Sequence, residues 1–153
     1  MESCFYKDGP ISLATVERVL EEWLGNYPVK LEKVLIIPPD GTRAHSLAGP
    51  ITNMLYHLVR PAQVKILPAL GTHVPMTIEE KQRIFGADIP LEVYLDHHWR
   101  TDVEQVGVVP GDFVSQVSEG LLDYSITVDI NREILNGGYD LILSVGQVVP
   151  HEV

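Results

Sequence analysis

Most histidines of this sequence lie in short polar segments that directly follow apolar runs. Five of the six are found at residues 38–45, 68–77, 96–100 and 146–151. An imidazole titrates near neutral pH, so two histidines on different loops that face a small ligand from opposite sides can move a proton. An arginine can bind a carboxylate through two hydrogen bonds. These residue types suit the transfer of a proton, or of a hydride with its accompanying proton, at a carbon beside a carboxylate.

Each of these residues also has a purely structural interpretation. Asp40 and Arg43 are close enough in sequence to form a surface ion pair worth at most about 1 kcal/mol. A single loop histidine such as His73 is more often structural than catalytic. His97 and His98 are adjacent, so in an extended segment their side chains point to opposite sides and do not readily bind one metal together. The chemical interpretation therefore requires that the four segments meet in space.

Strand and helix patterns alternate along the chain and should position these segments. Apolar runs typical of buried parallel strands occur at 34–37, 64–67, 91–95, 106–109, 126–130 and 141–145. Helical signals follow Ser12 up to Gly25, span 47–58, run from a Thr77–Glu80 capping box to Gly86, and run from Asp112 as helix cap towards Gly120. This order predicts a three-layer α/β fold with a largely parallel sheet flanked by helices. Ligands bind at the carboxyl ends of such strands, which is where the histidine segments lie.

The composition predicts a single α/β domain over residues 1–153. Hydrophobic residues make up 45% and charged residues 21% of the chain, as in ordinary globular domains. The net charge of −10 disfavours contact with nucleic acid phosphates. The first eight residues lack a signal-peptide pattern, and no apolar run reaches the roughly 18 residues that a membrane span needs. With Cys4 as the only cysteine, we expect a cytoplasmic protein without nucleic acid or membrane partners.

Four segments resemble the N-terminal domain of the nickel-dependent lactate racemase family. They are residues 40–43 (Asp-Gly-Thr-Arg), residues 70–77 (Leu-Gly-Thr-His-Val-Pro-Met-Thr), the stretch at His97, and residues 146–151. The resemblance runs in order from about residue 33 to the end of the chain. It implies an isomerase that inverts the carbinol carbon of a small 2-hydroxy acid. In that family a nickel-pincer nucleotide accepts the substrate hydride while two histidines alternate as base and acid.

The same resemblance assigns roles to individual residues. It implies that His73 and His151 are the two catalytic histidines. It implies that Arg43 binds the substrate anion, with Asp40 and Thr42 as further substrate-binding residues. This arrangement is chemically consistent, because racemisation needs one base on each face of the carbinol carbon.

The resemblance further implies a cofactor site and a longer enzyme. Cofactor contacts are expected from Gly71, Thr72 and His97, and no residue is assigned as a metal ligand. The cofactor-anchoring residues of the family and its second domain would lie beyond Val153, so we expect the N-terminal part of a two-domain enzyme and an inactive fragment. Val74 stands where the family usually has a basic residue, which leaves the identity of the hydroxy acid open.

Two alternatives remain open at this point. One is a metallohydrolase that uses His73, His97 or His98 with Asp96 or Asp40 around a divalent ion. The other is a homologue of the family that binds a metabolite without catalysis. Both alternatives use the same segments and differ from the first interpretation in the chemistry that the side chains perform.

Overall fold

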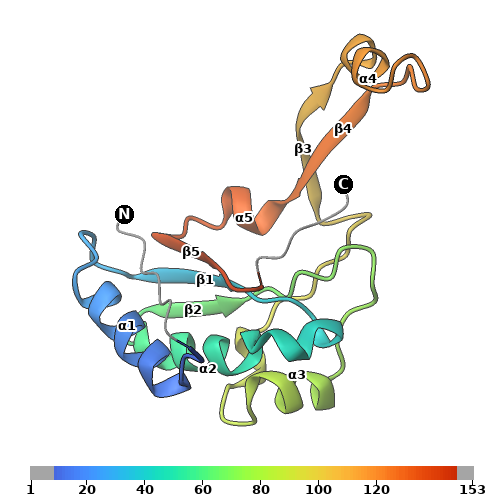
Figure 1. The fold of residues 1–153 in the computed structure, drawn as a ribbon. Helices are drawn as coiled ribbons and strands as arrows, with labels where there is room; N and C mark the ends of the chain where they lie inside the picture. Colours follow the sequence, from blue (N-terminus) through green and yellow to red (C-terminus); the bar gives the residue numbers. More distant parts are fainter. Residues whose placement is uncertain (1–8, 148–153) are drawn as a thin grey trace.

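Three parallel strands form the centre of the fold, in the order β2-β1-β5 (Figure 1). The computed structural model describes residues 9–147. The strands are β1 (Lys33–Ile37), β2 (Gln63–Ile66) and β5 (Leu141–Ser144). In the middle strand the side chains of Val34, Leu35 and Ile36 are fully buried, as the continuous apolar run predicts. The predicted α/β class with a parallel sheet is confirmed.

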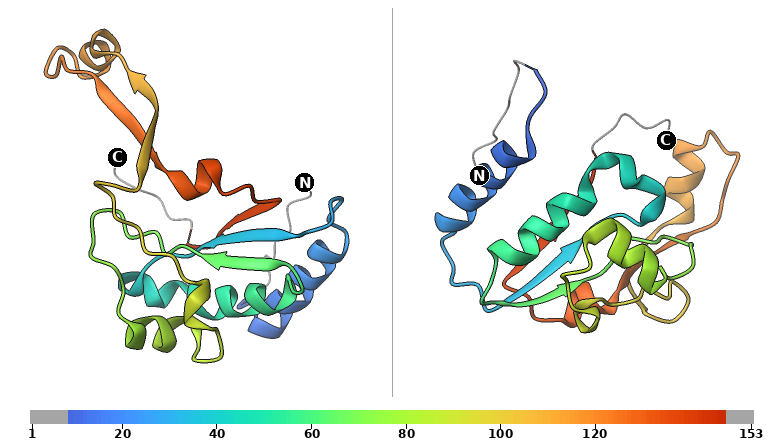
Figure 2. Two further views of the ribbon diagram at one scale, coloured as in Figure 1. Left: turned by 180° about the vertical axis from the view of Figure 1, so that it is seen from behind. Right: turned by 90° about the horizontal axis from the view of Figure 1, so that it is seen from below.

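Three helices lie together on one side of this sheet (Figures 1 and 2). They are α1 (Leu13–Gly25), α2 (Ala48–Leu58) and α3 (Ile78–Phe85). Leu55 and Tyr56 of α2 and Phe85 of α3 are buried in one core with Val34 and Ile36 of β1. Full burial of such a side chain stabilises the fold by roughly 1.5–3 kcal/mol. The helices therefore hold the sheet by the apolar stripes that their sequence spacing predicts.

The helix ends follow the predicted signals. The Ser12 side chain caps α1 by accepting a hydrogen bond from the Thr15 amide. The capping box between Thr77 and Glu80 is present at the start of α3, which ends at Gly86. Within residues 9–147, no helix has the length and apolar character that crossing a membrane requires.

Two further strands form a separate antiparallel ribbon instead of extending the parallel sheet. Strand β3 (Val103–Val109) pairs with β4 (Ile126–Asn131), and α4 (Gly111–Val117) lies in the connection between them. The ribbon projects away from the sheet, at the upper right of Figure 1. The short helix α5 (Arg132–Asn136) leads from its base back to β5.

Besides this ribbon, the structure differs from the sequence prediction at two further places. Residues 91–95 do not form a strand: Leu91–Val93 form the 3-10 helix η2 after Pro90, and only Tyr94 makes a single bridge to Ile66 of β2. The predicted cap Asp112 lies inside the first turn of α4, because Pro110 occupies the N-cap position. In both segments a proline with extended backbone directly precedes the first helical residue and so sets where the helix begins. The apolar residues of the sequence do not indicate this start.

Candidate active site

The loops that follow β1 and β2 run side by side and bring Asp40 close to His73. The parallel pairing of the two strands continues beyond their ends, because the Ala69 amide donates to the Pro38 carbonyl at 2.7 Å and Pro39 forms a bridge with Ala69. Both loops therefore leave the carboxyl edge of the sheet in the same direction. This is the edge at which parallel sheets bind ligands.

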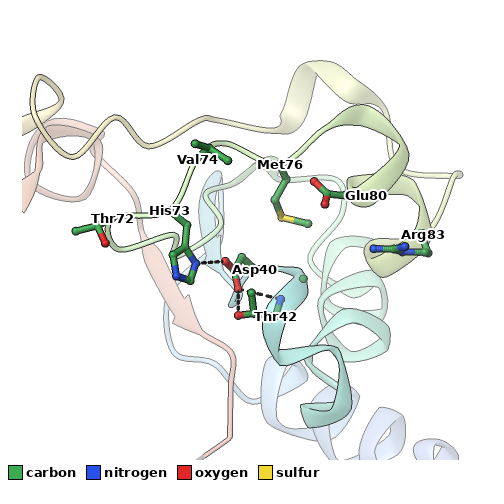
Figure 3. Close-up of a pocket in the computed structure, with 9 residues that line it drawn as sticks. Asp40, Thr42, Thr72, His73, Val74, Met76, Glu80 and Arg83 are labelled. Atoms are coloured by element: carbon green, nitrogen blue, oxygen red, sulfur yellow. Dashed lines mark hydrogen bonds and ion pairs between the residues drawn. The ribbon is translucent and has the colours of Figure 1, made fainter.

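Asp40 is the buried partner of an exposed histidine. Its Oδ2 lies 2.6 Å from Nδ1 of His73, and its Oδ1 accepts hydrogen bonds from the Thr42 amide at 3.1 Å and the Thr42 hydroxyl at 2.5 Å (Figure 3). The Asp40 side chain is 10% exposed and that of His73 is 58% exposed. Burial raises the pKa of Asp40, but the hydrogen bonds from Thr42 and His73 outweigh it and lower this pKa below its ordinary value. Asp40 is therefore a carboxylate at neutral pH.

The Asp40 carboxylate fixes the orientation and the tautomer of the His73 ring. An ionised carboxylate only accepts hydrogen bonds, so Nδ1 of His73 must carry the proton in their short contact. The lone pair of the neutral ring is then on Nε2. His73 can accept a proton from a ligand at this atom, and the resulting imidazolium is stabilised by Asp40.

Two glycines allow the backbone to present this pair. Gly71 has a φ of +58° in the turn that the His73 amide closes by donating to the Leu70 carbonyl at 3.0 Å, and glycine adopts this conformation without steric cost. At Gly41, a Cβ atom would lie 2.8 Å from Cδ1 of Ile84 in α3. The 3-10 helix η1 (Gly41–Ser46), which Asp40 caps, therefore packs closely against α3.

A cavity of about 590 Å³ lies beside the Asp40–His73 pair, and we call it the His73 pocket. Its volume is within the usual range of small-molecule sites. Glu80 and Arg83 of α3 form the wall opposite Thr72 (Figure 3). Among residues 9–147, Arg83 is the only lysine or arginine in the lining of this pocket. The lining consists of Asp40, Gly41, Thr42, Thr72, His73, Val74, Met76, Glu80 and Arg83.

A second cavity of about 480 Å³ lies between the strand ends and the base of the ribbon, and we call it the His97 pocket. Its lining is largely apolar, with the indole of Trp99 and the carboxylate of Asp129. In the part of the chain that the structure describes, this lining includes neither lysine nor arginine. Thr72 lines both pockets, so the two cavities are neighbours. The lining consists of Ile37, Leu67, Pro68, Ala69, Gly71, Thr72, His97, Trp99, Val103, Asp129, Ile130, Asn131 and Ile134.

Asn131 orients His97 in the opposite sense to His73. The buried Asn131 side chain accepts from the Glu133 amide at 2.8 Å through Oδ1, so its Nδ2 is the donor to Nδ1 of His97 at 2.9 Å. Nδ1 of His97 is therefore unprotonated, and Nε2 carries the proton of the neutral ring. The neighbouring His98 lines neither pocket, since its Nδ1 contacts Asp102 at 2.8 Å.

The structure places most of the predicted site residues in two groups, one at each pocket. Asp40, Thr42 and His73 line the His73 pocket, whereas Gly71 and His97 line the His97 pocket and Thr72 lines both. Arg43 is exposed in η1 and lines neither cavity. His151 lies outside the described residues, so its predicted position opposite His73 stays a prediction.

Sequence reasoning missed four residues of these pockets. Glu80 and Arg83 are three positions apart in the helix that follows the capping box, and this spacing places them on one helix face. Asn131 ends β4 and caps α5, and Trp99 follows the histidine pair. The sequence signal for Arg83 was available in the helical spacing, whereas the position of Asn131 depends on the ribbon returning to the sheet.

The candidate metal ligands do not form one cluster in the described part of the chain. Within residues 9–147, no group of three or more histidine, cysteine, aspartate or glutamate side chains could hold a metal ion. Asp96, a candidate ligand, instead pairs with the buried Lys81 at 2.8 Å.

Fold and site together define a class of protein, an α/β domain with a carboxylate-oriented histidine at the carboxyl ends of its parallel strands. The lactate racemase N-terminal domain family matches residues 10–153 of the chain. The chain therefore belongs to this family, and the resemblance in its motifs is confirmed. A comparison with curated proteins found no match.

Two solved structures share the fold. A crystal structure of a Thermotoga maritima protein is 28% identical, aligns with 96% of this chain and has a TM-score of 0.83. The lactate racemase apoprotein of Thermoanaerobacterium thermosaccharolyticum is 22% identical, aligns with 84% of this chain and has a TM-score of 0.56. The chain spans 36% of the first structure's chain and 31% of the second's.

Proposed function

We propose that this chain is the N-terminal part of a two-domain enzyme that racemises or epimerises a small 2-hydroxy acid. The observation that carries the proposal is the Asp40-oriented His73 beside a cavity of suitable size, in a chain of the lactate racemase N-terminal domain family. The hydroxy acid need not be lactate. Val74, which is 82% exposed at the His73 pocket, presents an apolar surface to the substrate.

In this proposal His73 handles the proton of the substrate hydroxyl. Inverting a carbinol carbon through a planar keto acid requires that the hydroxyl proton leaves when the C–H bond is broken and returns when it is re-formed. Nε2 of His73 accepts this proton, and the Asp40 carboxylate stabilises the imidazolium that results. His151 is proposed to perform the same task for the opposite enantiomer.

The substrate carboxylate needs a cation, because Asp40 and Glu80 both line the His73 pocket. Arg83 supplies one from within the lining. Arg43 lies in η1, directly after Thr42, and would reach the substrate only from outside that lining. We propose that Arg83 binds the carboxylate, with Arg43 as a secondary contact.

The His97 pocket fits part of the nickel-pincer nucleotide that the family implies. When bound, this group supplies a hydride acceptor. The apolar lining with Trp99 suits a flat ring, and Gly71 also belongs to this lining. Thr72 lies between the two pockets, and His97 offers an Nε2–H donor. Among residues 9–147, this lining has no lysine or arginine for a phosphate and carries the Asp129 carboxylate. We propose that residues outside the described part of the chain hold the phosphate and the metal.

The proposal is tested with the complete enzyme, loaded with cofactor and offered a panel of 2-hydroxy acids. His73→Ala should lower kcat by at least about 100-fold, because general acid–base catalysis contributes about that much. His98→Ala is the matched control: His98 also pairs with an aspartate and is equally exposed, at 58%, but lines neither pocket. His98→Ala should retain activity.

Other outcomes separate the alternatives. Near-normal racemisation by His73→Ala would remove this histidine from the mechanism. If the wild-type enzyme binds a hydroxy acid but does not invert it, the chain is a metabolite-binding homologue instead.

A further inference from the structure

The ribbon and its tip, residues 103–131, project away from the sheet (Figures 1 and 2), and we call this segment the arm. At the tip, Leu121 is 85% exposed, and Phe113, Val117, Leu122 and Tyr124 are 43–63% exposed. Soluble monomers rarely expose contiguous apolar surface of this kind without a binding role. A two-stranded ribbon also has little stability of its own. The arm is therefore expected to pack against another folded surface.

The strands of the arm are apolar on both faces. Val108 pairs with Thr127 and Val109 pairs with Ile126 in the antiparallel register. Because neighbouring residues of a strand point to opposite faces, Val108 and Ile126 project from opposite sides of the ribbon, where they are 48% and 44% exposed. A flat partner would cover only one of these faces. The pattern fits an arm that is inserted into a recess.

The tip of the arm has a fixed shape. The Leu122 amide donates to the Ser118 hydroxyl oxygen at 3.0 Å, and this hydroxyl donates to the Leu122 carbonyl at 3.2 Å. A Cβ atom on Gly111 would lie 2.6 Å from the Asp123 carbonyl oxygen, so α4 packs closely on the returning chain. These contacts hold Leu121 at the exposed end of a defined turn, as a preformed docking surface requires.

The charge of the arm selects the partner. Between residues 103 and 131 the chain has five acidic side chains and no lysine, arginine or histidine. Two copies of the arm would bring like charges together, which opposes an arm-to-arm dimer. The complementary surface is an apolar recess with lysine and arginine at its rim. The acidic residues are Glu104, Asp112, Glu119, Asp123 and Asp129.

We propose that the arm inserts into such a recess on the second domain of the same polypeptide and holds that domain over the His97 pocket; this inference rests on the proposed function. The Thermotoga maritima structure aligns with 96% of this chain, which leaves almost two thirds of its own chain for the partner surface. Val103, Asp129 and Ile130 at the base of the arm line the His97 pocket. A domain that covers the arm from its tip down to its base therefore lies beside that pocket.

Photo-crosslinking of the complete polypeptide, expressed from the gene extended past Val153, tests this proposal. Leu121→p-benzoylphenylalanine places the probe at the tip, and the same substitution at Val29, which is 53% exposed between α1 and β1, is the matched control. Irradiation should crosslink the tip peptide to peptides beyond residue 153, and the crosslinked protein should keep the mass of a single chain. The Val29 probe should not give these adducts. Leu121→Arg places a cation against the basic rim of the recess and should release the arm from the second domain. The radius of gyration measured by X-ray scattering should therefore increase.

The outcomes are distinguishable. Adducts at twice the chain mass would show that a second copy covers the arm, and the absence of adducts would show that nothing covers it; either overturns the inference. A reading frame that stops at Val153 overturns both this inference and the proposed function. Intrachain adducts in an enzyme that inverts no hydroxy acid support the arm contact and overturn the proposed function alone.

Discussion

Two histidines of this domain present opposite nitrogen chemistry to neighbouring cavities. Asp40 accepts from Nδ1 of His73 and leaves a lone pair on Nε2, whereas Asn131 donates to Nδ1 of His97 and leaves an N–H on Nε2. One ring is therefore prepared to take a proton and the other to donate a hydrogen bond. The difference comes from one partner in each case, a carboxylate that only accepts and an amide whose oxygen is already bound.

At the residue scale, Arg83 is the sharper test of substrate binding. Arg83→Met keeps the length of the side chain and removes its charge from the His73 pocket. We expect KM for the hydroxy acid to rise about tenfold with kcat little changed, because about 1.4 kcal/mol of binding free energy corresponds to that factor. Steady-state kinetics of the loaded enzyme provide the measurement.

Two companion variants interpret the result. Arg18→Met, on α1 and far from both cavities, should leave KM unchanged. Arg43→Met should have a smaller effect than Arg83→Met. If Arg43→Met has the larger effect, this result supports the sequence-based assignment, in which Arg43 binds the substrate carboxylate, over the proposed role of Arg83.

The sequence was informative for residues whose position follows from strand ends. Asp40 and His73 each follow a buried strand, and parallel strands end at the same edge, so their proximity could be predicted. Arg83 belongs to a helix wall and comes to the pocket only through the packing of α3 against η1. The helical spacing places Arg83 on the same helix face as Glu80, but it does not indicate that this face packs beside η1.

At the element scale, the contact between α2 and α3 positions the wall of the His73 pocket. Gly49→Ala would place a Cβ atom 2.2 Å from the Ile84 carbonyl oxygen, which is backbone and cannot rotate away. Alanine is favoured over glycine in a helix by about 1 kcal/mol, but the overpacking should outweigh this gain. We expect a net loss of about 1–3 kcal/mol in the free energy of unfolding, measured with denaturant.

Gly25→Ala is the control for this substitution. Gly25 ends α1 with no atom within 4 Å of the added Cβ, so its unfolding free energy should change by no more than about 0.5 kcal/mol. Equal stability of Gly49→Ala and the wild type would show that α3 moves freely on α2.

Elements with local signals were predicted well, and elements set by distant contacts were not. The capping box of α3 and the buried run of β1 each span only a few consecutive residues, so the local sequence determines both. Residues 91–95 are as apolar as a strand, but Pro90 starts a 3-10 helix and leaves one bridge to β2. Residues 106–109 and 126–130 are strands as predicted, and their antiparallel pairing outside the sheet depends on partners that periodicity does not identify.

At the scale of the whole molecule, the last strand of the described chain completes the parallel sheet. Strand β5 pairs with β1, from Val34–Leu141 to Ile37–Ser144, across more than a hundred residues. The sequence indicated a strand at 141–145 but not its neighbour. The carboxyl edge of the sheet, from which Asp40 and His73 extend, is therefore complete only when β5 pairs with β1.

Asp140, just before β5, connects this strand to the start of β1. Substituting Asp140 tests how much this connection stabilises the fold. Its Oδ2 accepts from the Glu32 and Lys33 amides, both at 2.8 Å, just before β1. The Lys33 amide, followed by that of Glu32, lowers the pKa of Asp140 below its ordinary 3.8. The unfolded chain therefore binds this proton more readily than the folded one, and the stabilisation is present above about pH 4 and is lost as pH falls through the lowered pKa.

Asp140→Asn should accordingly lower Tm at pH 7, and the difference from the wild type should shrink as the pH falls below about 4, the ordinary pKa of an aspartate. Glu17→Gln, at an exposed position of α1 outside the arm and both pockets, is the matched control and should leave Tm unchanged from pH 3 to pH 7. Thermal unfolding followed by circular dichroism between pH 3 and 7 measures both variants. A difference for Asp140→Asn that stays constant over this range would show that the carboxylate charge has no part in closing the sheet, and that β5 is held by its ladder and apolar contacts alone.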